Sequence, residues 1–239
     1  LAIGNPVAVS AFALQSLPGE FSMALRLSVA KQISERNANY VAYLHKKLNF
    51  NFNRGRQRKR IRVGYVSPDF RFHSVSVAFK GILDNHDTDR IEAYGYAAHS
   101  AEDDHMTNAL RERFHGYRQM NGQPFEVSAQ QIYDDGIDIL VDLAGHTKGG
   151  QLSLLALKPA PIQAHYLGYS ATIGASYLDY LITDHHQVPE EQRQYFSENL
   201  VYLPDTFMAT QRAPVAIDAF TRAQCGLPDD AFVFANFNT

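Results

Sequence analysis

An apolar strand that runs directly into a glycine-rich turn, and then into a helix, limits the fold of this chain more than any other feature. The segment is residues 137–180, IDILVDLAGHTKGGQLSLLALKPAPIQAHYLGYSATIGASYLDY. Apart from Asp138 and Asp142, residues 137–143 are all apolar, which is typical of a buried parallel strand. Open α/β folds bind their ligands at the carboxyl ends of such strands, so we expect the turn at 145–150 to lie at a ligand-binding edge.

Apolar strands alternate with helical stretches along the rest of the chain. This alternation indicates βαβ units and an α/β fold with a Rossmann-like, doubly wound, mainly parallel sheet. Strands are expected at 61–66, 92–97, 137–143, 163–167, 180–183, 200–203 and 232–237, and helices at 75–84, 103–114, 128–134, 152–157 and 190–195.

The first part of the chain has a different composition. Residues 20–48 place apolar positions at helical spacing without Gly or Pro, which predicts one long helix. Six basic residues then fall within the nine positions 54–62. No aromatic residues alternate with them, so a solvated linker is favoured over a nucleic-acid, phosphate or partner contact.

The composition also narrows the class of function. A net charge of −3 over 239 residues gives no general reason to expect nucleic acid as a partner. No apolar run approaches the roughly 18 residues of a membrane helix, so no membrane partner is expected. The single cysteine, Cys225, excludes an internal disulfide and fits the reducing cytoplasm. The chain starts without Met or a basic leader, which we interpret as the interior of a longer protein.

A second informative site follows the first expected strand, in VGYVSPDFRFHSVS. Pro68 and Asp69 turn the chain there, and His73 precedes a helix that Ser74 or Ser76 would cap. His73 is therefore expected in a loop at the carboxyl edge of the sheet. An imidazole in that position exchanges a proton near neutral pH or hydrogen-bonds a sugar hydroxyl. The alternative is that His73 only caps or packs the loop.

Asp142 and His146 lie four residues apart across the end of the strand at 137–143. In that geometry the carboxylate would orient the imidazole, or His146 and Thr147 would bind a hydroxylated ligand. The other interpretation is structural, with Asp142 capping the turn and its glycines allowing a tight bend. The turn has neither the Walker nor the dinucleotide glycine order, which disfavours ATP hydrolysis and NAD chemistry.

Two acidic clusters match metal-binding patterns only weakly. The triplets at 87–89 (DTD) and 184–186 (DHH) are short, and adjacent side chains rarely converge on one metal. No metal site is expected.

Four segments, in this order, resemble the catalytic region of the O-GlcNAc transferase family, including its plant SPINDLY-type members. They are VGYVSPDFRFHSVS, DGIDILVDLAGHTKG, ALKPAPIQAHYLGYSATIGASYLDYLITD and FSENLVYLP, within residues 61–204. The resemblance implies the first lobe of a two-lobed GT-B glycosyltransferase. Residues 1–58 would then be a helical connector to upstream tetratricopeptide repeats, 59–228 the N-terminal catalytic lobe, and 229–239 the start of the second lobe.

The same resemblance implies roles for single residues. His73 is similar to a family histidine in the catalytic cleft that acts as a base or an acceptor-site group. Asp142 is implied as a second catalytic residue, and His146, Thr147 and Lys148 as substrate-binding residues near the transferred sugar and the acceptor.

Three positions depart from the family pattern. Ser74 and Ser170 stand where prolines are usual, and Tyr166 stands where tryptophan is usual. These departures leave the identity of the sugar open.

The implied function is transfer of a sugar, with inversion and no metal, from a nucleotide sugar to Ser or Thr of a protein. The donor would be UDP-GlcNAc or GDP-fucose, and the partners a protein acceptor and a C-terminal catalytic lobe that lies beyond residue 239. Because a cleft with one wall cannot orient a donor, we do not expect transfer by these 239 residues alone. The alternatives are a SPINDLY-type protein O-fucosyltransferase and a non-catalytic module that binds sugar nucleotides or proteins.

Overall fold

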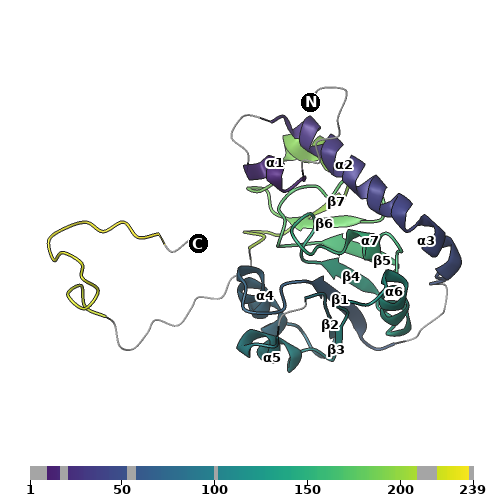
Figure 1. Ribbon diagram of the computed structural model, residues 1–239, viewed down its shortest axis with the longest axis horizontal. Helices are drawn as coiled ribbons and strands as arrows, with labels where there is room; N and C mark the ends of the chain where they lie inside the picture. The colour runs from purple at the N-terminus through teal and green to yellow at the C-terminus, as the bar shows by residue number, and fades with distance from the viewer. Residues whose placement is uncertain (1–9, 17–20, 53–57, 100–101, 209–219, 237–239) are drawn as a thin grey trace.

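The computed structural model describes residues 10–16, 21–52, 58–99, 102–208 and 220–236, and their centre is one seven-stranded sheet. The strand order is β3-β2-β1-β4-β5-β6-β7, and every neighbouring pair is parallel (Figure 1). The doubly wound, Rossmann-like sheet predicted from the sequence is confirmed. The strands are β1 (Ile61–Ser67), β2 (Ile91–Ala97), β3 (Gly116–Gln119), β4 (Ile139–Asp142), β5 (Ile162–His165), β6 (Tyr180–Thr183) and β7 (Asn199–Tyr202).

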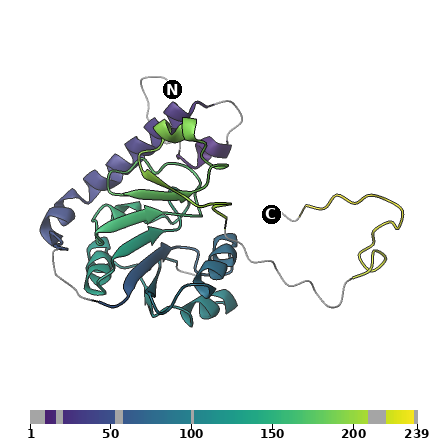
Figure 2. The same cartoon turned by 180° about the vertical axis from the view of Figure 1, so that it is seen from behind.

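Helices cover both faces of this sheet. Side chains alternate along each strand, so Val66 and Leu140 pack in one core with α2, α6 and α7, while Tyr65 and Val141 pack in a second core with α4 and α5. In both views α4 and α5 lie beside β1–β3, at the far end of the sheet from α1 and α2 (Figures 1 and 2). The helices are α1 (Ala13–Ser16), α2 (Met23–Tyr40), α3 (Ala42–Leu48), α4 (Ser74–Asp84), α5 (His105–Arg111), α6 (Phe125–Asp134), α7 (Leu152–Leu155) and the 3₁₀ helix η1 (Glu190–Tyr195).

The winding direction of the sheet reverses between β1 and β4. The chain passes from β1 outward to β2 and β3, then returns to place β4 on the other side of β1. Crevices at such reversal points, outside the carboxyl ends of the strands, are where open α/β sheets bind ligands. The loops after β1 and β4 are therefore neighbours at this position.

Three predicted elements differ from the structure. The helix expected at 20–48 is two helices, because Val41 is fully buried and its backbone leaves the helical range (φ −104°, ψ 9°), which bends α3 onto the core. The strand β3 was missed because GYRQ is short and only half-buried at the sheet edge. The strand expected at 232–237 is wrong over residues 232–236, where Phe232 and Phe234 are exposed and have no sheet to pack on; residue 237 lies outside the described residues.

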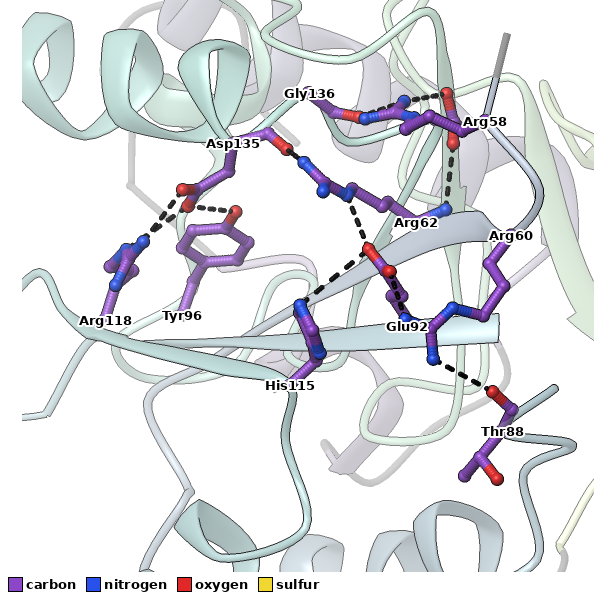
Figure 3. A network of polar contacts seen from close by, with 11 residues as sticks. Arg58, Arg60, Arg62, Thr88, Glu92, Tyr96, His115, Arg118, Asp135 and Gly136 are labelled. Atoms are coloured by element: carbon purple, nitrogen blue, oxygen red, sulfur yellow. Dashed lines mark hydrogen bonds and ion pairs between the residues drawn. The ribbon is translucent and has the colours of Figure 1, made fainter. Parts of the chain in front are cut away.

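A dense set of ion pairs closes the amino-terminal edge of the sheet (Figure 3). We call it the amino-edge network. Its members are charged side chains at or near the starts of β1, β2 and β4, and on β3. The pairs are Arg58–Asp138 at 2.7 Å, Arg60–Glu92 at 2.6 Å, Arg62–Glu92 at 2.7 Å and Arg118–Asp135 at 2.9 Å.

The network corrects the interpretation of the basic run as a solvated linker. Arg58, Arg60 and Arg62 belong to that run, yet each is paired with a carboxylate within the lobe. Arg62 also donates to the carbonyl oxygen of Asp135, at 2.6 Å. The carboxylates come from segments 30 to 80 residues away, so the run by itself does not reveal them. Residues 53–57, with Arg54 and Arg56, lie outside the described residues.

Candidate active-site cleft

A cavity of about 690 Å³ opens at the carboxyl ends of β1, β2 and β4, where the winding of the sheet reverses. It brings together three of the residues expected from the sequence, His73, Thr147 and Lys148. Asp142 and His146 do not line it. We call this cavity the cleft; its lining is Phe12, Pro68, Asp69, Arg71, His73, Ser74, Val75, Ala98, His99, Asn121, Thr147, Lys148, Gly149 and Gly168.

His73 occupies the N-cap position of α4, in place of the serines expected to cap that helix. Its Nδ1 accepts a hydrogen bond from the Val75 backbone N–H at 3.3 Å and lies 3.7 Å from an Asp69 carboxylate oxygen. The side chain remains 36% exposed, so the ring caps the helix and still faces the cleft. The structural interpretation of His73 as a cap is confirmed, and its role in the reaction stays a prediction.

The contacts of His73 give its two ring nitrogens different roles. While Nδ1 accepts from Val75, the neutral ring carries its proton on Nε2 and presents a donor to the cleft. If the Asp69 carboxylate, now 3.7 Å away, moved to hydrogen-bond distance and accepted from Nδ1, Nε2 would become free to accept a proton. Asp69 and Val75 therefore compete to decide whether the exposed nitrogen is a donor or a base.

Asp69 is the carboxylate inside the cleft. Burial raises its pKa, against the opposing charges of His73, Arg71 and His99. Arg71 lies 3.6 Å from one of its oxygens. Asp69 therefore brings a carboxylate to the cleft beside two imidazoles and a guanidinium.

Asp142 is fully buried beneath the turn after β4. Its carboxylate accepts hydrogen bonds from the backbone N–H groups of Ala144, at 3.2 Å, and Gly145, at 2.8 Å. It also contacts Nδ1 of His165 at 2.8 Å. The expected pairing of Asp142 with His146 is wrong as geometry: His146 turns away and donates from Nε2 to the carbonyl of Ile173, at 2.9 Å. Burial lowers the pKa of His146, so its neutral form is favoured.

His165 is the partner that the sequence did not reveal. Asp142 and His165 are direct neighbours in the register of β4 and β5. The second ring nitrogen, Nε2, contacts the Tyr169 carbonyl oxygen at 2.6 Å. Both partners are acceptors, so both nitrogens carry protons and the ring is an imidazolium. Burial lowers the pKa of His165, but the hydrogen bond and charge of Asp142 outweigh burial and leave that pKa raised.

The buried pair fixes two segments of the cleft wall. Asp142 holds the start of the 143–150 turn, and His165 holds the loop that contains Tyr169. Gly145, at φ +58°, passes so close to this pair that an added Cβ would lie 2.9 Å from the His165 ring. Gly149, at φ +85°, would bring a Cβ to 2.8 Å from Pro68, so the turn after β4 directly contacts the loop after β1.

The carboxylates of the two acidic clusters considered for metal binding accept hydrogen bonds from nearby backbone N–H groups. Asp184 accepts hydrogen bonds from three backbone N–H groups, those of His186, Gln187 and Phe207, which lower its pKa. Asp87 caps its own turn by accepting from the Asp89 N–H. Across the described ranges, no group of three His, Cys, Asp or Glu side chains has the arrangement to hold a metal ion. The helices in those ranges include none that is both long and apolar enough to cross a membrane.

Comparison with known proteins gives this geometry a family context. The profile of Glycosyl transferase family 41 matches residues 13–215. The chain is 33% identical over 185 residues to the probable UDP-N-acetylglucosamine–peptide N-acetylglucosaminyltransferase SEC of Arabidopsis thaliana, covering 75% of this chain and 19% of that protein. It is 37% identical over 155 residues to the UDP-N-acetylglucosamine–peptide N-acetylglucosaminyltransferase of Caenorhabditis elegans, covering 64% of this chain and 14% of that protein. The chain thus spans less than a fifth of the length of these relatives.

A solved structure shows the same arrangement of elements. A mutant O-GlcNAc transferase from Thermobaculum terrenum superposes with a TM-score of 0.71 at 26% sequence identity. The match covers 83% of this chain and 37% of that one. The similarity therefore includes most of the sheet and helices described above.

Proposed function

The chain belongs to glycosyl transferase family 41, and from that premise we propose that it forms one wall of the active site of a protein O-glycosyltransferase. The full-length protein transfers a sugar from a nucleotide sugar to a Ser or Thr hydroxyl, with inversion at the anomeric carbon. The observation that carries this proposal is the convergence of His73, Thr147 and Lys148, from two separate sequence motifs, in one cleft at the carboxyl edge of the sheet.

His73 is proposed as the group that handles the acceptor proton. Its Nε2 donates a hydrogen bond while Nδ1 accepts from Val75, and it would accept a proton if Asp69, 3.7 Å from Nδ1, moved close enough to accept from Nδ1. An imidazole with both options near neutral pH suits a step in which a hydroxyl loses its proton as it attacks.

Thr147 and Lys148 are proposed as substrate-binding residues. The Thr147 side chain already donates to the Ala144 carbonyl at 2.8 Å, so its oxygen is available as an acceptor for a ligand hydroxyl. Lys148 is exposed at the cleft and supplies a mobile positive charge suited to a diphosphate.

Asp142 and His146 are proposed to act from behind the cleft wall. Asp142 acts through His165 and the turn N–H groups, and His146 holds the wall through the Ile173 carbonyl. Their contribution to turnover is therefore the placement of Thr147 and Lys148.

We also propose how this chain is joined to the rest of the protein, which would supply the remainder of the site. Residues 1–58 are proposed to connect to upstream tetratricopeptide repeats, 59–228 to form this lobe, and 229–239 to begin a second catalytic lobe. That lobe and its cationic groups would face the donor diphosphate, so the proposed reaction uses no metal. The proposed compartment is the cytoplasm, and the acceptor is a protein.

The test is sugar transfer by the full-length protein to a Ser/Thr peptide, with UDP-GlcNAc and GDP-fucose supplied separately. Transfer from UDP-GlcNAc is expected, as the names of the curated relatives suggest for those proteins. Transfer from GDP-fucose alone would assign the SPINDLY-type reaction instead. The proposal is overturned if the full-length protein binds and transfers neither donor. Transfer by residues 1–239 alone would overturn the assignment of a second wall.

A further inference from the structure

The imidazole of His99 lines the cleft without any hydrogen-bond partner. It follows the end of β2 by two residues and is 6% exposed. Neither Nδ1 nor Nε2 contacts a donor or acceptor, and among the described residues it is the one side chain with two such buried atoms. Buried polar groups in folded proteins are almost always hydrogen-bonded. An imidazole with two unsatisfied nitrogens, beside a ligand-sized cavity, indicates a partner that is not part of this chain.

The neighbouring charges restrict the chemistry of that partner. Asp69 faces the same part of the cleft, and its carboxylate interacts electrostatically with His99. A phosphate placed against His99 would lie beside this carboxylate, whereas Lys148 in the same lining offers a phosphate a cation instead. A neutral hydroxyl has no such conflict, because it donates to the carboxylate while the imidazole both donates and accepts.

The number of polar groups favours a polyhydroxylated ligand over a single Ser or Thr hydroxyl. Besides His99 and Asp69, the cleft presents Asn121 from the loop after β3 and Thr147 from the turn after β4. One acceptor hydroxyl, with one donor and two acceptor positions, cannot satisfy all four of these groups, whereas a sugar ring carries several hydroxyls. We propose that His99 binds the glycosyl group of the donor, a role that rests on the proposed glycosyltransferase function.

This binding requires a small change of the ring. Both nitrogens of His99 are shielded from solvent in the present arrangement, while the ring itself borders the cavity. Binding therefore requires that the side chain turn to another rotamer and present one nitrogen to the cleft. Because the ring makes no hydrogen bond, no hydrogen bond is broken by that turn.

The test compares His99→Phe with the matched control His115→Phe in the full-length protein. His115 lies at the amino-edge network, on the opposite side of the sheet. Calorimetry would measure the Kd of UDP-GlcNAc and of UDP alone. His99→Phe is expected to weaken UDP-GlcNAc binding about tenfold, the value of one hydrogen bond, and to leave UDP binding unchanged. His115→Phe is expected to change neither.

The Tm of His99→Phe and the affinity of a second variant, His99→Asn, test the proposal in two further ways. Phe replaces the unpaired imidazole with an apolar ring of similar shape, so the Tm of His99→Phe is expected to equal or exceed that of the wild type. His99→Asn retains a donor and an acceptor and is expected to recover part of the UDP-GlcNAc affinity.

The outcomes separate this inference from the proposed function. If the wild type binds UDP-GlcNAc and His99→Phe binds it equally well, or loses UDP and UDP-GlcNAc affinity in the same proportion, the assignment of His99 to the sugar is wrong and the function stands. A wild type that binds and transfers no nucleotide sugar overturns both. Loss of peptide affinity with unchanged UDP-GlcNAc affinity would place His99 at the acceptor and overturn the sugar assignment.

Discussion

The two edges of the central sheet differ in how completely their polar side chains are paired. At the amino-terminal edge, Arg58, Arg60, Arg62 and Arg118 are each paired with a carboxylate at 2.6–2.9 Å (Figure 3). At the carboxyl-terminal edge, the imidazole of His99 has no partner. Paired charges hold an edge together, whereas unsatisfied groups leave binding capacity for a ligand. Under the proposed function, the amino-terminal edge stabilises the fold and the carboxyl-terminal edge serves the reaction.

The strongest test of this division is His73→Ala in the full-length protein. Loss of a positioned acid–base group is expected to lower kcat roughly 100- to 10,000-fold. The Tm should change little, because one half-exposed cap contact is lost. Steady-state kinetics and thermal unfolding measure the two effects. The matched change at the other edge, His115→Ala, should preserve kcat; equal losses of turnover in both variants would contradict the division.

The Asp142–His165 pair lies beneath the carboxyl edge. Like the arginines of the amino edge, both of its side chains have hydrogen-bond partners of complementary charge or polarity. His165→Leu leaves Asp142 buried without its counter-charge and is expected to cost about 3–5 kcal/mol in the local free energy of opening. Hydrogen–deuterium exchange of the β4 and β5 amides measures it. The double variant Asp142→Asn with His165→Gln removes both charges and should recover part of the loss. A single variant with unchanged exchange rates would show that the pair does not stabilise the wall.

The same pair predicts a pH dependence of stability above about pH 6.5. The pKa of His165 is raised in the folded protein, so its stabilisation is complete below the unfolded pKa, about 6.5, and is lost as pH rises through the folded pKa. Between those two values, protection of β4 and β5 amides should fall by up to about 1.4 kcal/mol per pH unit. His165→Gln should remove this slope. A stability that rises over that range would contradict the assignment of an imidazolium.

The smallest effect is expected from Glu92→Gln in the amino-edge network. Glu92 is 11% exposed and holds Arg60 and Arg62, which are themselves 38% and 26% exposed, so solvent weakens both pairs. The expected loss of stability is about 1 kcal/mol, with kcat unchanged. The matched control Glu112→Gln removes an exposed carboxylate and should alter neither quantity. A large loss of kcat in Glu92→Gln would show that the amino edge also serves the reaction.

The sequence predicts the features that depend on local pattern. Apolar runs located β1, β2, β4 and β5, and the rule that parallel strands present their carboxyl ends at one edge correctly brought His73 to Thr147 and Lys148. The proposed roles of these residues remain predictions. Predicting the position of each of these residues needed only an apolar strand, the point where it ends and the turn that follows.

Features that depend on strand register were not predictable. The partner of Asp142 is 23 residues away and is set by the alignment of β4 with β5, which the sequence does not encode locally. The arginine pairings depend on the same kind of distant alignment. His99 is one of ten histidines, and only its burial without a partner distinguishes it.

The pairing of Asp142 with His165 also bears on how the chain reaches its fold. Strands β4 and β5 are four residues each, and apolar side chains alone would tolerate more than one alignment. A slip of one residue turns His165 to the opposite face of the sheet and strands the Asp142 charge in the core. Misaligned pairings of β4 and β5 are thus less stable than the observed one. The buried Asp142–His165 ion pair therefore specifies the register of β4 and β5, because it forms in only one alignment of the two strands.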